Sequence, residues 1–454
     1  MLNPYIFREY DIRGKVADDF PPEIVVLLGR AFGTFVKRSG GQEIALSGDI
    51  RLTTPDLIDA FREGVLSTGT DVINLRIVPT PVNYYSMFKL NVSGAVQITG
   101  SHNPPEFNGF KLSLHKKPVY GSQITSLKKI IELGDFEYGE GTETRYKILP
   151  DYKQMILSKI NIERTMRVVM DCANAAAAIN APEIFRDLGV ELTELYCEPD
   201  GTFPNHHPDP TVEKNLADLI TTVRSGSYDV GISFDGDADR IGVVDETGDI
   251  IWADQLLTLF LPEVLDPGGE IIYDVKCSQA LEDMIKRYGG KPVMWKTGHS
   301  LIKQRMADLG CKLGGEMSGH IFFADEYFGY DDAIYVAARL VQLLSRSEKT
   351  LSELKAEIPT YYSTPEMRLE AESDEEKFRI AKKAVDYFQD AYDCSTVDGV
   401  RIRFGDGWGL VRSSNTQPVI VCRFEADSPE RMKEIKDLVM GKLQEFGNLE
   451  TNDI

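Results

Sequence analysis

The sequence predicts an α/β protein: three related mixed α/β domains, followed by a smaller α+β domain. Short apolar runs alternate with helical patterns over most of the chain, which is typical of largely parallel sheets covered by helices. This alternation begins again twice, and its character changes past about residue 365. The chain has 454 residues, which at roughly 150 residues per domain is too long for one ordinary core.

The first α/β unit shows the alternation most clearly. Residues 44–49 predict a buried strand that ends in a polar loop. A helical pattern follows at 53–66, and residues 71–75 predict the next strand. Residues 93–98 predict a further strand, which leads into a loop rich in small and turn-forming residues. This order of strands, helix and turn residues is typical of βαβ units.

The second and third units begin the pattern again without a strict sequence repeat. The predicted elements are strands at 167–171 and 228–234 around a helix at 182–188, and then a strand at 270–275, a helix at 278–288 and a strand at 292–295. The strand at 167–171 is followed by an Ala-rich segment, and the strand at 228–234 ends in an acidic loop, at the edge where ligands of α/β sheets usually bind.

The last part of the chain predicts a different domain. Helical patterns at 374–392 and 428–446 enclose strands at 397–404 and 419–424, with a Gly-containing turn at 405–408. We expect domain boundaries near residues 150, 252 and 366. The predicted domains are 1–150, 151–252, 253–366 and 367–454.

The composition is that of a soluble globular protein, with 42% hydrophobic and 27% charged residues. The net charge is -21, which disfavours nucleic-acid binding because that function needs a basic surface. An anionic small-molecule substrate stays possible, since a local cluster of Arg and Lys can oppose the global field. No obligatory protein partner is evident.

The six cysteines are scattered without CxxC spacing, so a zinc site is not expected. The first residues show no basic region before an apolar core, and so no signal peptide. No apolar run reaches the roughly 18 to 20 residues of a membrane span. We therefore expect a cytoplasmic protein without a membrane partner.

An acidic loop directly follows the strand predicted at 228–234. Asp235, Asp237 and Asp239 alternate with small residues, so three carboxylates can converge on one cation. Oxygen ligands suit Mg²⁺ or Ca²⁺ rather than Zn²⁺. An EF-hand is disfavoured, because its twelve-residue loop follows a helix and ends in a bidentate Glu. An acidic turn is the alternative, but the position at a strand end favours a metal site.

A serine lies in the loop after residues 93–98. Turn-forming residues surround Ser101 and would expose its hydroxyl, while His102 and Lys111 add a titratable group and a cation. The G-x-S-x-G elbow of hydrolases is absent, because Thr99 and Asn103 stand where its glycines belong. A phosphoserine on the metal of the acidic loop is chemically coherent. For this segment alone, a hydrolase nucleophile and a plain turn stay open.

A Gly-rich segment at 314–320 precedes an apolar run at 321–323. Glu316 and Ser318 would point to the same side of an extended loop, where they could hold adjacent sugar hydroxyls. His320 could transfer a proton. By itself, such a segment is more often a structural turn.

The segment at 412–418 gathers polar groups between two predicted strands. Arg412, Ser414, Asn415 and Thr416 supply a guanidinium, hydroxyls and an amide, which suit a phosphate group. An ordinary polar β-turn is the alternative.

Three further polar residues lie in suggestive places. Arg13 precedes a glycine and could reach an anion, although its segment could equally be an N-terminal strand with surface charges. Lys276 and His299 each follow a predicted strand, where a polar contact with a ligand is possible.

Together and in this order, these segments resemble the α-D-phosphohexomutase superfamily, and within it the bacterial-type phosphomannomutase/phosphoglucomutase branch. The resemblance extends over essentially the whole chain, from Arg13 to Arg412. It implies four domains around a central cleft, of which three share a mixed α/β core. It also implies reversible transfer of phosphate between C1 and C6 of hexose phosphates.

The resemblance assigns a role to each segment, with Ser101 as a phosphoserine. The residues implied in catalysis are Ser101, His102, Lys111, Arg13 and His320, of which Lys111 and His320 are the leading candidates for proton transfer. Those implied in substrate binding are Arg240, Lys276, His299, Glu316, Ser318, Arg412, Ser414, Asn415 and Thr416. Those implied in binding one Mg²⁺ are Ser101, Asp235, Asp237 and Asp239.

The implied reaction passes through a bound hexose 1,6-bisphosphate, which also activates the enzyme. Phospho-Ser101 donates its group to a hexose 1- or 6-phosphate and recovers the other phosphate after the intermediate turns over. We expect the last domain, which carries Arg412, to move as a gate.

One residue bears on the choice of substrate. Met317 favours mannose and glucose phosphates, because the glucosamine branch of the superfamily typically has Gln at this position. Phosphoglucosamine mutase is the alternative within the superfamily. Outside it, a Ser-dependent sugar phosphatase and an inert sugar-phosphate-binding protein stay open, the second disfavoured because Ser101 and the three aspartates are all present.

Overall fold

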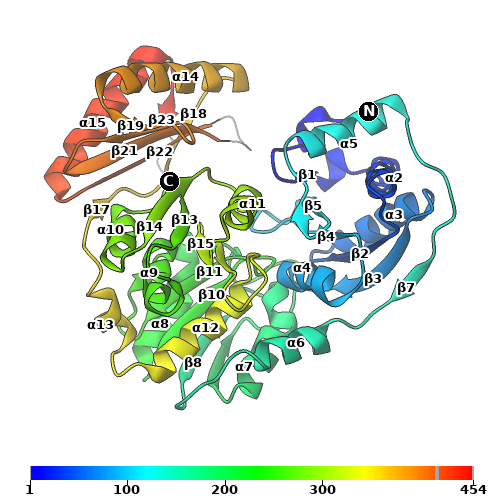
Figure 1. Ribbon diagram of the computed structural model, residues 1–454, viewed down its shortest axis with the longest axis horizontal. Coiled ribbons are helices and arrows are strands. Elements are labelled where there is room, and N and C mark those ends of the chain that lie inside the picture. Colours follow the sequence, from blue (N-terminus) through cyan, green and yellow to red (C-terminus); the bar gives the residue numbers. More distant parts are fainter. Residues whose placement is uncertain (1, 415–418, 452–454) are drawn as a thin grey trace. The chain divides into compact units, whose positions relative to one another are not determined.

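The computed structural model describes residues 2–414 and 419–451 (Figure 1). The chain divides into two compact units. Unit 1 comprises residues 1–253 and 318–355, and unit 2 comprises residues 254–317 and 356–454. None of the helices in the described part of the chain has the length and apolar character that a membrane crossing requires.

Unit 1 begins with a mixed sheet and its helices. Their bounds are η1 Pro4–Ile6, β1 Ile12–Lys15, α1 Val16–Asp19, α2 Pro22–Arg38, β2 Glu43–Gly48, α3 Thr54–Leu66, β3 Asp71–Ile77, α4 Thr80–Lys89, β4 Gly94–Ile98, β5 Phe107–Leu114, β6 Lys117–Pro118, α5 Ser122–Leu133, β7 Glu143–Arg145 and α6 Leu149–Leu157. The strand order is β1-β5-β4-β2-β3-β7, with β6 paired to β5. Strands β4, β2 and β3 are parallel, so their carboxyl ends share one edge.

Two glycines let α2 and α3 pack closely (Figure 1). A Cβ atom on Gly29 would lie 2.1 Å from the carbonyl oxygen of Phe61, and one on Gly64 would lie 2.1 Å from that of Val26. The Phe61 ring also stacks on Phe110 of β5, with centroids 5.2 Å apart. The helix pair is thereby fixed to the sheet by one continuous apolar core.

The second sheet of unit 1 carries the acidic loop. The elements in and around this sheet are β8 Arg167–Asp171, η2 Ala176–Ile179, α7 Ala181–Asp187, β9 Glu191–Leu195, η3 Glu213–Leu216, α8 Ala217–Ser225, β10 Val230–Phe234, β11 Ile241–Asp245 and β12 Ile250–Ile251. Unit 1 also includes β16 Ile321–Phe323, which is not a strand of this sheet, α12 Ala333–Arg346 and α13 Leu351–Lys355. The strand order is β12-β11-β10-β8-β9. Because β9, β8 and β10 are parallel, the loops after them meet at one edge.

Unit 2 holds a parallel sheet and a C-terminal antiparallel sheet. The elements are α9 Ala253–Val264, β13 Glu270–Asp274, α10 Gln279–Arg287, β14 Lys291–Trp295, α11 His299–Leu309, β15 Leu313–Gly315, β17 Tyr362–Ser363, β18 Met367–Glu370, α14 Asp374–Ala391, β19 Asp393–Ser395, β20 Val400–Arg403, β21 Gly407–Ser413, β22 Val419–Ala426, α15 Pro429–Phe446 and β23 Glu450–Thr451. Strands β14, β13 and β15 are parallel. The C-terminal order is β19-β20-β21-β22-β18-β23, and α14 and α15 pack on it.

The predicted fold class is confirmed, with mixed α/β sheets followed by a C-terminal α+β domain. Three local expectations were wrong. The strand predicted to end at Val275 ends one residue earlier, at Asp274, and Lys276 lies in the following turn. Arg412, predicted in a loop, lies in β21. Residues 317–318 form a turn, so the alternation of an extended loop does not apply to Glu316 and Ser318.

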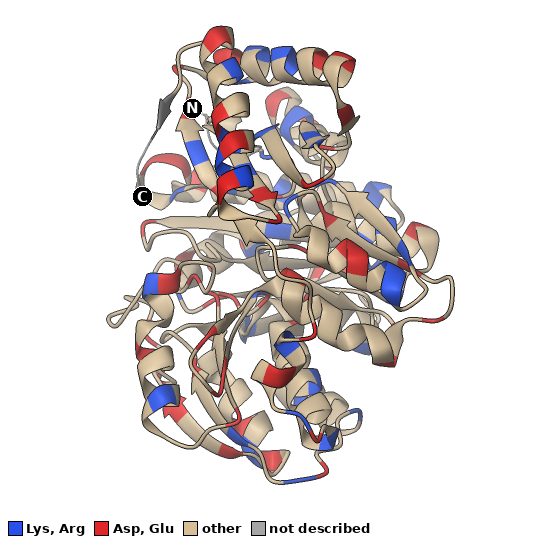
Figure 2. Cartoon of the chain, turned by 90° about the vertical axis from the view of Figure 1, so that its left-hand side faces the viewer, with Lys and Arg blue, Asp and Glu red and all other residues tan. Residues whose placement is uncertain are grey.

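The acidic excess of the composition is spread along the chain. Figure 2 shows Asp and Glu on helices and loops throughout the view, with Lys and Arg interspersed among them. The net charge of -21 therefore does not describe any particular site, and the charge of each site follows from its own residues.

Candidate active site

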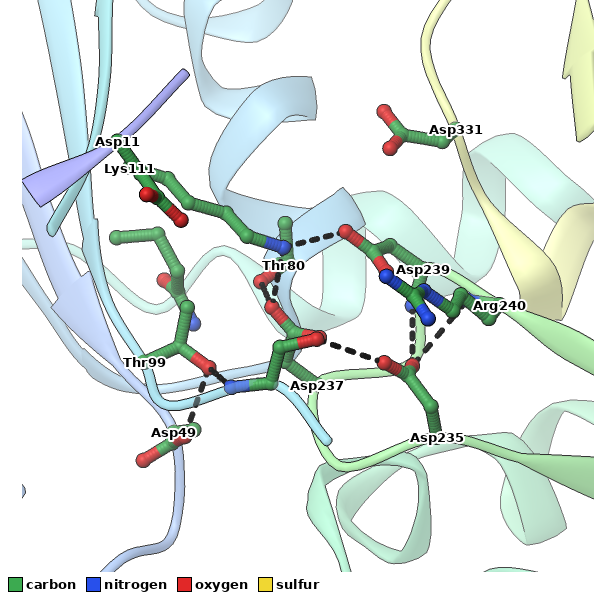
Figure 3. Close-up of polar contacts among 12 residues, drawn as sticks. Asp11, Asp49, Thr80, Thr99, Lys111, Asp235, Asp237, Asp239, Arg240 and Asp331 are labelled. Carbon is green, nitrogen blue, oxygen red and sulfur yellow. Dashed lines mark hydrogen bonds and ion pairs between the residues drawn. The ribbon is translucent and has the colours of Figure 1, made fainter. Parts of the chain in front are cut away.

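The acidic loop begins where β10 ends and returns the chain into β11. The side chains of Asp235, Asp237 and Asp239 are fully buried, and one carboxylate oxygen of each lies within 4.8 Å of the others. The loop is held by a hydrogen bond from the Asp235 amide to the Arg240 carbonyl oxygen at 3.2 Å, and by Ala238 at φ +65°. The three carboxylates converge as their spacing predicts (Figure 3).

Lys111 of β5 lies against this cluster. Its Nζ donates to Oδ2 of Asp237 at 2.7 Å and to Oδ2 of Asp239 at 2.5 Å. Burial alone would lower the Lys111 pKa, but the two carboxylates raise it well above its ordinary value. The pKa of Asp235, by contrast, is raised well above its ordinary value by burial and by the charges of Asp237 and Asp239. The ammonium group of Lys111 thus compensates only part of the negative charge that three buried carboxylates can carry.

The acidic cluster could hold a metal ion. Within the described residues, Oδ1 of Asp237 and Oδ1 of Asp239 are buried and accept no hydrogen bond. A desolvated carboxylate oxygen without a donor is unfavourable by a few kcal/mol. A hard cation with oxygen ligands would satisfy both atoms, and so the donor set fits such an ion.

Ser101 meets the acidic cluster from the first sheet. Its Oγ donates to Oδ2 of Asp235 at 3.0 Å and lies 3.1 Å from Nδ1 of His102. The loop is constrained, as predicted, and Ser101 has φ +48°, a left-handed conformation that is strained for a residue with a side chain. The expectation of an exposed hydroxyl was wrong: Ser101 is only 2% exposed, because the serine loop lies against the acidic loop.

A buried arginine holds the serine loop, and sequence reasoning missed it. The guanidinium of Arg51 donates to four backbone carbonyl oxygens, those of Ser101 at 2.8 Å, Asn103 at 2.5 Å, Pro104 at 2.6 Å and Phe107 at 3.0 Å. Its charge is matched by Asp49, 3.3 Å away. The signal was available, since Asp49 ends the strand predicted at 44–49 and Arg51 follows it, at the edge where functional groups gather.

Asp49 completes the support of the loop. Its Oδ2 accepts from Oγ1 of Thr99 at 2.8 Å and from the Gly100 amide at 3.1 Å. Thr99 Oγ1 in turn accepts from the Ser101 amide at 2.8 Å. The backbone at Ser101 is therefore held on both sides. Its amide donates to Thr99, which donates to Asp49, and its carbonyl oxygen accepts from Arg51.

Two contacts join the acidic loop to the first sheet. A Cβ atom on Gly236 would lie 2.1 Å from the carbonyl oxygen of Ser101, so only glycine permits this approach. Thr80, at the start of α4, donates from Oγ1 to Oδ2 of Asp237 at 2.5 Å and from its amide to the Asp237 carbonyl oxygen at 2.9 Å. Thr80 was not predicted, since a Thr-Pro helix start carries no signal for such a contact.

His102 and Arg13 lie beside Ser101. Burial, followed by the charges of Arg240 and Arg13, lowers the pKa of His102 well below its ordinary value, so the imidazole is neutral. Arg13 lies in β1, as the strand alternative predicted, and donates to Oδ1 of Asn103 at 3.3 Å and to Oδ2 of Asp11 at 2.6 Å. The structure thus brings both predicted residues to the serine loop.

His320 and Arg240 form a second polar group in unit 1. Nε of Arg240 donates to Nε2 of His320 at 2.9 Å, which leaves the imidazole proton on Nδ1. Nδ1 lies 3.0 Å from Oδ2 of Asp331 and 3.5 Å from Oδ1 of Asp239. Asp331 was not predicted, although the acidic pair Asp331-Asp332 after an aromatic segment was visible.

The other predicted residues lie in unit 2, apart from Ser318, which belongs to unit 1. Lys276 Nζ lies 3.2 Å from Oε2 of Glu366, whose pKa the lysine lowers to about 2. Oε1 of Glu316 accepts from the Gly298 amide at 3.1 Å, directly before His299 at the start of α11. Glu366 was missed, because it stands alone in a loop 90 residues from Lys276 in the sequence.

Arg412 and Ser414 belong to the C-terminal sheet. Nε of Arg412 donates to Oδ2 of Asp398 at 2.9 Å, and the same oxygen accepts from the Thr297 amide at 3.1 Å. Asp398 therefore joins Arg412 to the segment that leads to His299. The Ser414 amide donates to the Val419 carbonyl oxygen at 2.9 Å. Asn415 and Thr416 lie outside the described residues.

Four family models match the chain in order. They are described as phosphoglucomutase/phosphomannomutase α/β/α domain I at residues 4–137, domain II at 150–248, domain III at 252–362 and the C-terminal domain at 366–442. Together they match nearly the whole chain.

Named proteins are similar over their full length. A phosphomannomutase/phosphoglucomutase of Pseudomonas aeruginosa is 44% identical over 97% of this chain and 95% of its own length. A phosphoglucomutase of Neisseria meningitidis serogroup A is 40% identical over 98% of each chain. Among solved structures, a phosphoglucomutase/phosphomannomutase family protein of Burkholderia thailandensis matches 99% of this chain and 100% of its own, with a TM-score of 0.93 and 40% identity.

Proposed function

The chain belongs to the phosphoglucomutase/phosphomannomutase family and is an enzyme that moves phosphate between C1 and C6 of hexose phosphates, and we propose that Ser101 carries the phosphoryl group. The observation that supports this assignment is the contact of Ser101 Oγ with Asp235 at 3.0 Å, at the edge of the buried acidic cluster. A hydroxyl so placed can receive a phosphoryl group whose oxygens reach the same cation as the carboxylates.

We propose that the cation is Mg²⁺, one per chain. Asp235, Asp237 and Asp239 would hold it together with an oxygen of the Ser101 phosphate. Bound there, Mg²⁺ would neutralise charge on the transferring phosphoryl group. The buried carboxylate oxygens that accept no hydrogen bond support this assignment.

The chain's own residues have distinct parts in the proposal. Arg51 and Asp49 hold Ser101 in its strained conformation before transfer, so that little reorganisation is needed. Lys111 supplies a fixed cation beside the transferring group. His320, whose Nδ1 lies 3.0 Å from Oδ2 of Asp331, is the candidate for moving the proton of the sugar hydroxyl.

Substrate binding is proposed for a second set of residues. Lys276, His299, Glu316 and Ser318 would hold the sugar, with Arg240 near the transferring phosphate. Arg412, Ser414, Asn415 and Thr416 would bind the phosphate that does not react. The same groups can receive the substrate in two orientations, because a hexose 1,6-bisphosphate carries a phosphate at each end.

The proposal extends to organisation and specificity. We assign the four domains to residues 1–150, 151–252, 253–366 and 367–454, and expect the last one to move as a gate. Met317 favours mannose and glucose phosphates over glucosamine phosphate. Phosphoglucosamine mutase is the second candidate, and this single position is what distinguishes it from the first.

An isomerase assay tests the function. Glucose 1-phosphate, mannose 1-phosphate and glucosamine 1-phosphate are each supplied with Mg²⁺ and a trace of hexose 1,6-bisphosphate. We expect turnover of the first two substrates, without steady release of inorganic phosphate. Glucosamine 1-phosphate as the preferred substrate would favour the second candidate, and stoichiometric phosphate release would identify a phosphatase instead.

A further inference from the structure

Two cysteines meet at the edge of the second sheet, although no spacing in the sequence pairs them. Cys172 follows the last residue of β8, and Cys197 lies two residues beyond β9, the parallel neighbour of β8. Their Sγ atoms are 3.3 Å apart. Cys172 is buried, whereas Cys197 is half-buried and so the one open to a reagent.

The segments after both cysteines reach the proposed reaction loops within unit 1. After Cys172, the Ala176 amide donates to the carbonyl oxygen of Gly236 in the acidic loop at 3.3 Å. After Cys197, the imidazole of His207 bonds to the carbonyl oxygen of His102. A change in the distance between the two strand ends therefore acts on the acidic loop and on the serine loop together.

A further contact ties the Cys197 segment to the support of Ser101. The ring of Phe203 lies under the guanidinium of Arg51, 5.3 Å from centroid to Cζ. Phe203 also packs with Ala173 and Ala175, which follow Cys172. The two segments thus share one apolar cluster, which also includes Ile50 next to Arg51.

We propose that Cys172 and Cys197 form a reversible disulfide on exposure to a hydroperoxide, and that this bond slows the mutase. Bonding requires the sulfur atoms to approach from 3.3 Å to about 2.05 Å, a closure of roughly 1 Å. The strand ends are already adjacent, so no rearrangement of the sheet is needed. The approach of the two sulfur atoms displaces the segments that contact Gly236 and His102.

The chemistry balances with one hydroperoxide per disulfide. Cys197, as its thiolate, attacks the terminal oxygen; the O–O bond breaks and an alcohol or water leaves, giving a sulfenic acid. Sγ of Cys172 then attacks the Cys197 sulfur, the S–O bond breaks, and the thiol proton of Cys172 leaves with the hydroxyl as water. Two thiols lose two electrons in total, and a dithiol reductant reverses the process.

Peptide mapping tests the bond without reference to enzyme activity. Trypsin releases residues 168–186 and 187–214 as separate peptides, each with one of the two cysteines. The folded full-length protein is treated with hydrogen peroxide, unreacted thiols are blocked, and the digest is analysed by mass spectrometry. We expect the two peptides to stay joined and to separate on reduction. Both peptides with blocked thiols, or with sulfinic acid, would overturn the proposal.

A matched variant separates this bond from other oxidation. Cys394 is also half-buried, and its Sγ contacts the Phe388 carbonyl oxygen at 3.3 Å, much as Cys197 Sγ contacts that of Leu195 at 3.4 Å. Cys394→Ser is expected to keep peroxide sensitivity, whereas Cys172→Ser and Cys197→Ser are expected to lose it.

The activity readout depends on the proposed function and is measured in parallel. We expect peroxide to lower the wild-type mutase rate several-fold, and a dithiol to restore it. A joined peptide pair with unchanged mutase rate would overturn the effect on the enzyme. Inactivity of untreated protein would instead contradict the proposed function, while the peptide map would still decide the disulfide.

Discussion

Nη2 of Arg51 donates to the carbonyl oxygen of Ser101 at 2.8 Å, from a side chain that is only 1% exposed. The contact explains why a strained serine persists at the centre of the proposed site. It also explains a neighbouring glycine, since a Cβ atom on Gly100 would lie 2.4 Å from Cζ of Arg51. One guanidinium, with its planar set of donors, thus accounts for both the support of Ser101 and the glycine before it.

Replacement of Arg51 by Lys tests this support. The charge is kept, but an ammonium cannot satisfy four carbonyl oxygens arranged around a planar group, and each buried oxygen left without a donor is unfavourable by about 1–3 kcal/mol. We expect Arg51→Lys to lower kcat at least tenfold and to lower the melting temperature. Arg38→Lys is the control, because Arg38 is 39% exposed and pairs with Asp135 and Glu137 on the surface. Equal behaviour of the two variants would refute the supporting role.

The approach of the acidic loop to the serine loop is tested at Gly236. A methyl group there would lie 2.1 Å from the Ser101 carbonyl oxygen, so Gly236→Ala should move the serine away from Asp235 and lower kcat at least tenfold. The control is Gly441→Ala in α15, where a Cβ atom meets nothing within 4 Å. This second change should stabilise the helix by up to about 1 kcal/mol and leave kcat unchanged. Full activity of Gly236→Ala would show that the close contact is dispensable.

Metal binding has a readout in stability as well as in activity. A cation that satisfies the free oxygens of Asp237 and Asp239 binds only the folded state, so Mg²⁺ should raise the melting temperature in a concentration-dependent way. Chelation should abolish mutase activity, and Mg²⁺ should restore it. Asp237→Asn should reduce both effects, whereas Asp386→Asn, on the exposed face of α14, should keep them. A melting temperature of wild-type protein that is indifferent to Mg²⁺ would contradict the assignment.

Asp332 predicts a defined pH dependence of stability. Burial raises its pKa to about 6, although Tyr327 and Tyr152 donate to its carboxylate at 2.5 Å and 2.8 Å. Since the folded-state pKa exceeds the unfolded value near 3.8, the folded state holds this proton more tightly. The contribution of Asp332 to the free energy of unfolding is therefore greatest below pH 4 and declines as the pH rises to about 6.

The measurement is a pair of denaturant titrations across this pH range. Asp332→Asn keeps the cap on the Tyr335 amide but does not titrate. We expect the free energy of unfolding of the variant, minus that of wild type, to increase by about 2 kcal/mol between pH 4 and pH 6. A difference that stays constant with pH would mean that Asp332 titrates normally in the folded protein.

Much of the fold could be predicted from the sequence, because hydrophobic periodicity and turn residues are local. The strand before the acidic loop and the helices of the C-terminal domain lie close to where these patterns put them. The strand end at Asp274 was missed by one residue, since Val275 continues the apolar run although the chain already turns. Such errors arise where an apolar residue lies in the turn that follows a strand.

The site could be predicted only in part. The convergence of Asp235, Asp237 and Asp239 follows from their spacing alone. The role of Arg51 does not, because the carbonyl oxygens that it contacts lie 50 or more residues away in the sequence. The meeting of Cys172 with Cys197 likewise depends on the parallel pairing of β8 with β9. Contacts of this kind are set by sheet order, which a single sequence does not display.

The most direct test of the central claim is transfer of a labelled phosphate to Ser101. Dephosphorylated protein is incubated with Mg²⁺ and hexose 1,6-bisphosphate carrying a labelled phosphate, and the tryptic peptide of residues 90–111 is sequenced by mass spectrometry. The account predicts label on Ser101 and not on Ser93, and a Ser101→Ala variant that accepts no label and has lost isomerase activity. Near wild-type isomerase activity in Ser101→Ala, or label on another residue, would contradict it.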